Sequence, residues 1–270
     1  MKRLLVILLL IPILGISQYT AIPDQNFEQA LIDLGYDNVI DGQVLSSNID
    51  TITVLNVEFK NISDLTGIED FNALTHLSCS GNLLTSLDLS NNTALTYLQS
   101  SPNYSLTSLD VSGCNALTYL SCEMTQLTSL DVSQNIALTK LVCSNSQLTS
   151  LDVSQNTALD SLLCDFNQLT SLDVSGCNAL TYLNCRWNPP LTSLDVSKNT
   201  ALIKLVCSNT PLTSLDVSQN TALNSLMCWN SSLECLNLKN GNDTNFLMLW
   251  ASSNPYLYCI EVDNPNWATQ

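Results

Sequence analysis

Basic side chains are scarce in this chain. Its 270 residues include 8 Lys and Arg against 24 Asp and Glu, which gives a formal net charge of −16 at pH 7. Nucleic-acid binding requires a basic patch, and anionic membrane surfaces attract basic segments. The composition therefore argues against a nucleic-acid partner and disfavours binding to an anionic membrane surface. It suits solubility, cation binding or a basic partner.

Histidine and glycine are also rare. His76 is the only histidine, and the eight glycines form no Gly-rich phosphate loop. A histidine-based catalytic triad would depend on this one residue. We therefore expect no enzymatic activity and no cofactor.

Long apolar runs are absent except at the start of the chain. Residues 4–14 form an apolar run of 11 residues after Lys2 and Arg3, and small residues precede Gln18. A membrane anchor is the alternative interpretation, but a spanning helix needs about 20 residues. The pattern predicts a signal peptide at residues 1–17 and a secreted, extracellular or cell-surface chain without membrane insertion. Its removal takes away two positive charges and leaves −18.

An internal repeat of 21 or 22 residues dominates the rest of the chain. One unit runs from Leu138 to Ala158 and contains a Leu-x-Cys segment followed by a Leu-Asp-Val segment. The Asp of the second segment recurs as Asp88, Asp110, Asp131, Asp152, Asp173, Asp195 and Asp216. The Cys of the first segment recurs as Cys79, Cys122, Cys143, Cys164, Cys185, Cys207 and Cys228, with Ser100 and Ala251 in the same slot.

Each repeat predicts two short strands. Alternation along a strand points Leu, Cys and Val inward and leaves the residues between them outside. One unit cannot bury its own apolar face, so successive units must stack, with strands paired in parallel. An asparagine three residues past the Cys slot can bond backbone groups at the turn. It occurs as Asn82, Asn103, Asn167, Asn188 and Asn254, and Thr125, Ser146, Thr210 and Ser231 replace it elsewhere.

The consensus Leu-x-x-Leu-x-Cys-x-x-Asn-x-Leu-x-x-Leu-Asp-Val covers roughly residues 52–262. It resembles the short, Cys-containing class of leucine-rich repeats of secreted bacterial proteins, which is related to internalin-type repeats. The resemblance implies a curved solenoid, an extracellular location, and protein or glycan binding without catalytic residues. Many members of this class continue into a C-terminal anchoring domain.

We therefore expect a mostly β repeat solenoid, a right-handed superhelix with two short parallel strands per coil of about 21 residues. The expected regions are the signal peptide at 1–17, an N-terminal cap at 18–50, the leucine-rich-repeat solenoid at 51–251 and a degenerate repeat or cap at 252–270. Whether the chain is a fragment truncated before an anchoring domain is left open. Phe27 to Leu34 predicts a short capping helix with Asp24 as N-cap and Gly35 as its stop.

Most of the eleven cysteines belong to the ladder. Metal or redox chemistry is the alternative to a column of buried free thiols, but metal sites use short spacings such as C-x-x-C, and none occurs here. We expect no metal site and buried thiols, including Cys114 and Cys177. Cys235 and Cys259 lie instead at outward positions of successive coils. They are disulfide candidates in an oxidising compartment, with two unpaired surface thiols as the alternative.

The seven aspartates form a column of like charges about 5 Å apart. We expect the column either to attract cations, as weak and nonspecific screening, or to raise the pKa of some of these aspartates. Calcium needs six to eight oxygen ligands from several directions, which a flat column does not supply.

The outward positions of the Cys-containing strand vary from coil to coil, whereas the other strand repeats Thr-Ser-Leu-Asp almost unchanged. Aromatic and Arg clusters are typical of binding surfaces, and drift on an unconstrained surface is the alternative. The binding residues we predict on this face and its adjoining loop are Tyr97, Tyr119, Glu123, Asp165, Phe166, Tyr182, Arg186, Trp187, Trp229 and Trp250.

The sequence therefore favours a non-catalytic, monomeric binding module that presents this face to a protein or glycan partner. A structural surface or matrix spacer is one alternative. The other is a carbohydrate-active enzyme that uses Glu123 and Asp165, which lie two coils apart in one column, about 10 Å. The identity of the ligand does not follow from the sequence.

Overall fold

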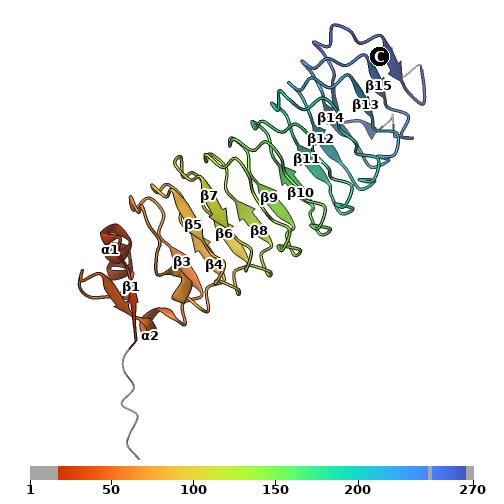
Figure 1. Ribbon diagram of the computed structural model, residues 1–270. Coiled ribbons are helices and arrows are strands. Elements are labelled where there is room, and N and C mark those ends of the chain that lie inside the picture. The colour runs from red at the N-terminus through yellow and green to blue at the C-terminus, as the bar shows by residue number, and fades with distance from the viewer. Residues whose placement is uncertain (1–17, 243–244, 266–270) are drawn as a thin grey trace, which may run out of the picture.

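The computed structural model describes residues 18–242 and 245–265, and the predicted signal peptide lies outside them. The chain winds into an elongated solenoid with a small helical cap at its N-terminal end (Figure 1). The predicted fold class is confirmed: the repeats form a parallel β-solenoid, with one Leu-x-Cys strand in almost every coil.

The Leu-x-Cys strands build one continuous parallel sheet of ten strands, joined in register at each step. In chain order its members are β3 (Val54–Asn56), β4 (His76–Ser78), β6 (Tyr97–Gln99), β8 (Tyr119–Ser121), β9 (Lys140–Val142), β10 (Ser161–Leu163), β11 (Tyr182–Asn184), β12 (Lys204–Val206), β14 (Ser225–Met227) and β16 (Met248–Trp250).

The Leu-Asp strands are regular only near the two ends. β5 (Ser86–Asp88) pairs with β7 (Ser108–Asp110), and β13 (Ser214–Asp216), β15 (Cys235–Asn237) and β17 (Cys259–Glu261) form a three-stranded sheet. Between them, the described chain has only isolated bridges at Asp131–Asp152 and Asp152–Asp173. Two backbone bonds that join these middle coils, from the N–H groups of Thr149 and Thr170, are 3.3 and 3.2 Å long. Regular strand pairing between the middle coils is therefore confined to the ten-stranded sheet.

The core is one continuous column of leucine, valine and cysteine side chains between the two strand sides. The inward leucines of the ten-stranded sheet, such as Leu141 and Leu162, are fully buried. All seven ladder cysteines, Cys114 and Cys177 are buried, as predicted. No helix in the described ranges is long and apolar enough to cross a membrane.

The N-terminal cap closes the first coil. It contains β1 (Tyr19–Ala21), α1 (Gln25–Asp33), β2 (Gln43–Leu45) and α2 (Ser46–Ile49), and a 3₁₀ turn (Ile68–Asp70) follows in the first coil. Asp24 is the N-cap of α1, and Gly35 follows the C-cap at φ 82°. Asp24 also accepts bonds from the backbone N–H and hydroxyl of Ser63, which fasten the cap to the solenoid.

A ladder of buried asparagines satisfies the backbone where each coil leaves the ten-stranded sheet. The Asn167 amide donates to the carbonyl oxygens of Cys143 (2.9 Å) and Cys164 (3.1 Å). Its oxygen accepts from the Leu148 N–H at 3.0 Å. One side chain therefore bonds three backbone groups in two coils, because buried backbone groups must find partners. Asn82, Asn103, Asn188 and Asn254 repeat the arrangement.

We predict that Asn167→Ala lowers the free energy of unfolding by about 2–4 kcal/mol, because it leaves buried carbonyl and N–H groups without partners. Gln168→Ala is the matched control, since its exposed side chain lies beside the ladder. Denaturant unfolding of both variants gives the comparison. Equal stability of the two variants would contradict the role assigned to Asn167.

Candidate binding surface

Outward side chains of the ten-stranded sheet form stacked columns. The parallel register aligns His76, Tyr97, Tyr119 and Lys140 on β4, β6, β8 and β9. The Tyr97 and Tyr119 rings stack at 4.5 Å with an interplanar angle of 7°, and His76 stacks on Tyr97 at 5.7 Å. Packing restricts the rotamers of these rings, so a partner that binds them loses little conformational entropy.

Lysines cap two of the tyrosines. The Lys140 ammonium lies 5.6 Å from the Tyr119 ring centroid, and Lys204 lies 4.8 Å from that of Tyr182, both within cation–π range. Burial, followed by the Asp165 charge, raises the pKa of the Tyr182 hydroxyl. This side of the sheet therefore presents tyrosine rings with a lysine ammonium beside two of them.

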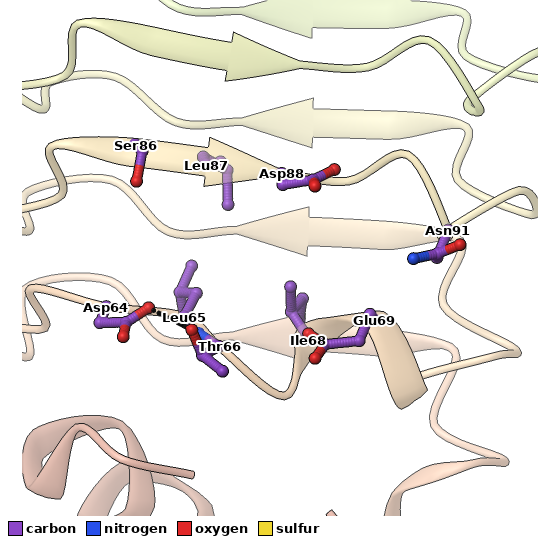
Figure 2. A pocket seen from close by; sticks show the side chains of 9 residues that line it. All are labelled: Asp64, Leu65, Thr66, Ile68, Glu69, Ser86, Leu87, Asp88 and Asn91. Carbon is purple, nitrogen blue, oxygen red and sulfur yellow. Dashed lines mark hydrogen bonds between the residues drawn. The ribbon is translucent and has the colours of Figure 1, made fainter. Parts of the chain in front are cut away.

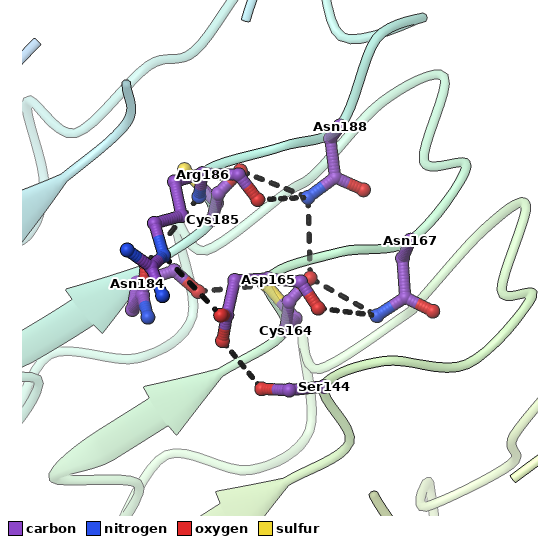
Figure 3. Close-up of polar contacts among 8 residues, drawn as sticks. All are labelled: Ser144, Cys164, Asp165, Asn167, Asn184, Cys185, Arg186 and Asn188. Atoms are coloured by element: carbon purple, nitrogen blue, oxygen red, sulfur yellow. Dashed lines mark hydrogen bonds and ion pairs between the residues drawn. The ribbon is translucent and has the colours of Figure 1, made fainter. Parts of the chain in front are cut away.

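Asp165 and Arg186 form a compact polar network at the end of β10 and β11 (Figure 3). The Ser144 hydroxyl donates to one Asp165 oxygen at 2.5 Å, and Arg186 Nε lies 3.4 Å from the other. Asp165 is only 6% exposed, whereas Arg186 is half-exposed and lies over the Phe166 ring at 5.0 Å. A ligand would therefore meet the guanidinium rather than the carboxylate.

Phe166 and Trp187 stack on each other in the turns that follow this network. Their ring centroids are 5.7 Å apart and their planes differ by 10°. Both residues have left-handed backbone conformations, with φ of 55° and 53°. Other coils place Asn145, Asn209 and Asn230 at this position, and Asn tolerates that region better than a bulky aromatic residue. The aromatic pair therefore occupies a backbone position that local preference does not favour.

The predicted binding residues fall into three groups. Tyr97 and Tyr119 form the first. Asp165, Phe166, Tyr182, Arg186 and Trp187 form the second, as the contacts above show. Glu123, Trp229 and Trp250 lie outside both groups, and Trp250 is 53% exposed on β16 near the C-terminal end of the solenoid.

The aspartate column on the other side is held by local hydrogen bonds. Each of the seven carboxylates accepts from the backbone N–H of the serine two residues later, at 2.8–2.9 Å. The serine N–H bond, followed by the serine hydroxyl, lowers the pKa of Asp131, Asp152 and Asp195. In Asp88 and Asp173 the hydroxyl is the larger cause of the lowered pKa, and the N–H bond is the smaller. In Asp216 they outweigh burial, which acts to raise the pKa. The expectation of raised pKa values in this column is wrong, because these bonds outweigh repulsion through water.

Acid should therefore weaken the fold through these groups. A carboxylate with a folded-state pKa below its ordinary value of 3.8 stabilises the protein above that value and loses the effect as the pH falls through the folded pKa. We predict that the melting temperature falls between about pH 5 and pH 2. The triple variant D131N/D152N/D173N should show a smaller fall, because Asn keeps the turn acceptor but does not titrate. Identical pH profiles of the two proteins would contradict this account.

A hollow of about 280 Å³ lies between the first coil and β5, next to Asp64, Glu69 and Asp88 (Figure 2). The carboxylates are already used in local turns: Asp64 accepts from the N–H and hydroxyl of Thr66, and Glu69 accepts from the Gly67 N–H. Within the described residues, no group of three or more His, Cys, Asp or Glu could hold a metal ion. The hollow marks a gap beside an unpaired strand edge.

The thiols of the cysteine ladder are buried and unreactive. Burial raises the pKa of Cys79, Cys122, Cys185 and Cys228 to about 12, and that of Cys143, Cys164 and Cys207 well above its ordinary value. Thiolates are the reactive form, so these thiols are inert at neutral pH.

Cys235 and Cys259 lie opposite each other on β15 and β17 and are half-exposed. A hydrogen bond with the Cys259 thiol raises the pKa of Cys235 to about 11. Both residues are free thiols in the structure, and their oxidation to a disulfide stays a prediction.

Alkylation of the folded protein separates these two classes of cysteine. We expect the ladder thiols to resist iodoacetamide until the protein is unfolded. In an air-oxidised sample Cys235 and Cys259 should resist it until a reductant is added, because they form a disulfide. Peptide mass spectrometry reads each site. Labelling of Cys235 and Cys259 without reductant would identify them as surface thiols instead.

The repeat, the sheet and the ladder together define a leucine-rich-repeat solenoid with a cysteine core. Neither a protein-family profile nor a curated protein matches the chain. Among solved structures, the functional domain of InlJ from Listeria monocytogenes, which includes a cysteine ladder, is 32% identical over 91% of this chain and 62% of that chain, with a TM-score of 0.49. This chain thus spans about three fifths of that one.

Two further structures share the fold. Internalin C2 from Listeria monocytogenes is 18% identical over 92% of this chain and 98% of that chain, with a TM-score of 0.54. The ectodomain of the Arabidopsis thaliana receptor kinase GASSHO1/SCHENGEN3, solved in complex with CASPARIAN STRIP INTEGRITY FACTOR 2, is 20% identical over 75% and 26%, with a TM-score of 0.56. The chain has the leucine-rich-repeat solenoid fold of these two structures and is similar in sequence to the InlJ domain.

Proposed function

We propose that this chain is a secreted or cell-surface binding module that holds a protein or glycan partner against the outer face of its ten-stranded sheet. The stacked column of His76, Tyr97, Tyr119 and Lys140 is the observation that carries the proposal. Aromatic and cationic side chains that are held rigid and half-exposed are typical of binding hot spots.

The contrast between the two strand sides supports the same function. The Leu-Asp side repeats the same polar residues and uses its aspartates to hold turns. The outward residues of the ten-stranded sheet vary among the coils. A spacer protein has no need for this difference, whereas a binding surface requires variety on the side that meets the partner.

The internalin relationship favours a non-catalytic role, since leucine-rich-repeat domains of this kind are typically not enzymes. The carboxylate of Asp165 also lies under Arg186 and accepts the Ser144 hydroxyl. A general acid or base must reach its substrate, and Asp165 is instead paired and buried.

A binding screen of the mature chain against extracellular proteins and glycans tests the function. The triple variant Y97S/Y119S/Y182S removes the rings and introduces the residue that the chain itself uses at Ser161 and Ser225 of the same column. We expect it to weaken the selected interaction by at least about tenfold, the loss of one hot-spot contact.

The matched control is S129A/S150A/S171A, which changes exposed residues of the opposite strand side. It should bind as the unchanged protein does. Equal affinity of the tyrosine variant and the control would remove the ten-stranded sheet as the binding surface.

A further inference from the structure

A shallow groove of about 420 Å³ follows the turns beyond the C-terminal part of the ten-stranded sheet. Trp187, Asn209, Asn230 and Ser253 lie along it in four successive coils, each with a φ between 50° and 57°. The Asn209 N–H bonds the Trp229 carbonyl and the Asn230 N–H bonds that of Ser252, which fixes one coil against the next. The groove therefore runs along the solenoid axis.

The groove carries no charge. Its lining consists of one tryptophan, prolines, serines, a threonine and asparagines, in a chain whose net charge is −16. A charged ligand would find no opposite charge here, whereas a neutral polar ligand would meet no desolvation cost from an ionised group.

Two buried polar atoms of the lining have no hydrogen-bond partner. They are Nδ2 of Asn209, a residue that is 9% exposed, and the hydroxyl oxygen of Ser231, which is 8% exposed. The Asn230 amide donates to the Asn209 oxygen, so the Asn209 side chain keeps its N–H₂ group as a donor. A buried donor without a partner costs stability, and a ligand that supplied an acceptor would recover that cost.

Ser231 departs from the structural role of its slot. In the preceding coil, the Thr210 hydroxyl donates a hydrogen bond to the Cys207 carbonyl. In the following coil, the Asn254 amide donates to the carbonyl of Cys228. Both of these carbonyls are therefore bonded without the Ser231 hydroxyl. That hydroxyl is left as a donor and acceptor for a ligand in the groove.

Trp187 supplies the apolar wall. It is 44% exposed, and Phe166 of the preceding coil covers one face of its ring. Trp187 lines the groove together with Asn209 of the next coil. Pro189, Pro211 and Pro255 add further apolar surface.

A flat aromatic wall, hydrogen-bonding donors and zero charge match a sugar ring, which has an apolar C–H face and hydroxyl groups at its edge. Peptide capture through the main chain fits less well, because the N–H groups of Asn209 and Asn230 are already bonded to the neighbouring coils.

We propose that this groove is a subsite for a neutral carbohydrate unit that packs on Trp187 and hydrogen-bonds Asn209 and Ser231. The proposal rests on the binding function above and names the ligand class for this part of the surface. It lies in the turns beyond the strands, so it is separable from the tyrosine column on the sheet.

The test uses the full mature chain and a panel of neutral hexasaccharides built from glucose, galactose, mannose or N-acetylglucosamine, with calorimetric titration of each. We expect at least one to bind. Trp187→Asn should weaken the binding of that hexasaccharide by at least about tenfold. Asn209→Asp should weaken it by a similar factor, because the carboxylate keeps the acceptor for Asn230 but lacks the donor and adds a negative charge.

Met124→Asn is the matched control. Met124 occupies the same left-handed position in a coil outside the groove, with φ 55°. It should bind as the unchanged protein does. Thermal unfolding checks the variants, and Asn at position 187 should not lower the melting temperature, because Asn tolerates this backbone region.

Selective loss in the two groove variants supports the proposal. Binding that all variants retain equally, or the absence of binding to every sugar of the panel, overturns the subsite. Neither of these results decides the binding function of the sheet, because the protein screen with the tyrosine variant tests that function separately.

Discussion

The register between neighbouring coils depends on hydrogen bonds that buried asparagines make to the backbone. Every coil must turn sharply after its sheet strand, and the turn leaves carbonyl and N–H groups inside the protein. Asn167 and Asn188 satisfy groups of their own coil and of the coil before at once. The adjacent cysteine slot needs a side chain small enough for that close approach, and a buried thiol needs little hydrogen bonding.

Fixed register turns every repeated residue into a column. The same spacing stacks Tyr97 on Tyr119 and sets Asp152 between Asp131 and Asp173. In water, unit charges 4 Å apart interact by only about 1 kcal/mol. Local bonds from serine N–H groups are comparable or stronger, so the aspartate column is tolerated and the pKa values of Asp88, Asp131, Asp152, Asp173, Asp195 and Asp216 are lowered. The ring stack and the aspartate column thus both follow from the alignment of the coils. The chemistry of each side chain then decides whether it is used within the fold, as the aspartates are, or is left to contact a partner, as the tyrosines are.

Much of the fold could be predicted from the sequence, because the repeat length of 21 or 22 residues can be read directly from the recurring Cys and Asp positions. The Cys column, its burial, the asparagine slot and the capping helix with Asp24 and Gly35 all follow from local patterns. The interrupted Leu-Asp strands could not be predicted in this way. Their motif is almost invariant along the chain, so the sequence does not distinguish the coils whose Leu-Asp strands pair regularly from those joined by isolated bridges.

The candidate site was only partly visible in the sequence. Alternation placed Tyr97, Tyr119 and Tyr182 on the outer face, but burial of Asp165 under Arg186 depends on contacts between coils. The left-handed backbone at Phe166 and Trp187 could have been inferred from the sequence, because Asn, which tolerates this conformation, recurs at the equivalent position of other coils. The groove beside Trp187 depends on donors left unused at Asn209 and Ser231, which becomes apparent only when partners are counted in three dimensions.

Hydrogen–deuterium exchange resolved to single amides tests the central claim of stacked coils in continuous register most directly. The amides of Cys122, Cys143, Cys164 and Cys185 each bond the following coil, so they should exchange slowly and at similar rates. The amides of Thr149 and Thr170, on the side without regular strand pairing in these coils, should exchange faster. Rapid exchange at the cysteine amides, or equal protection on both sides, would contradict the account.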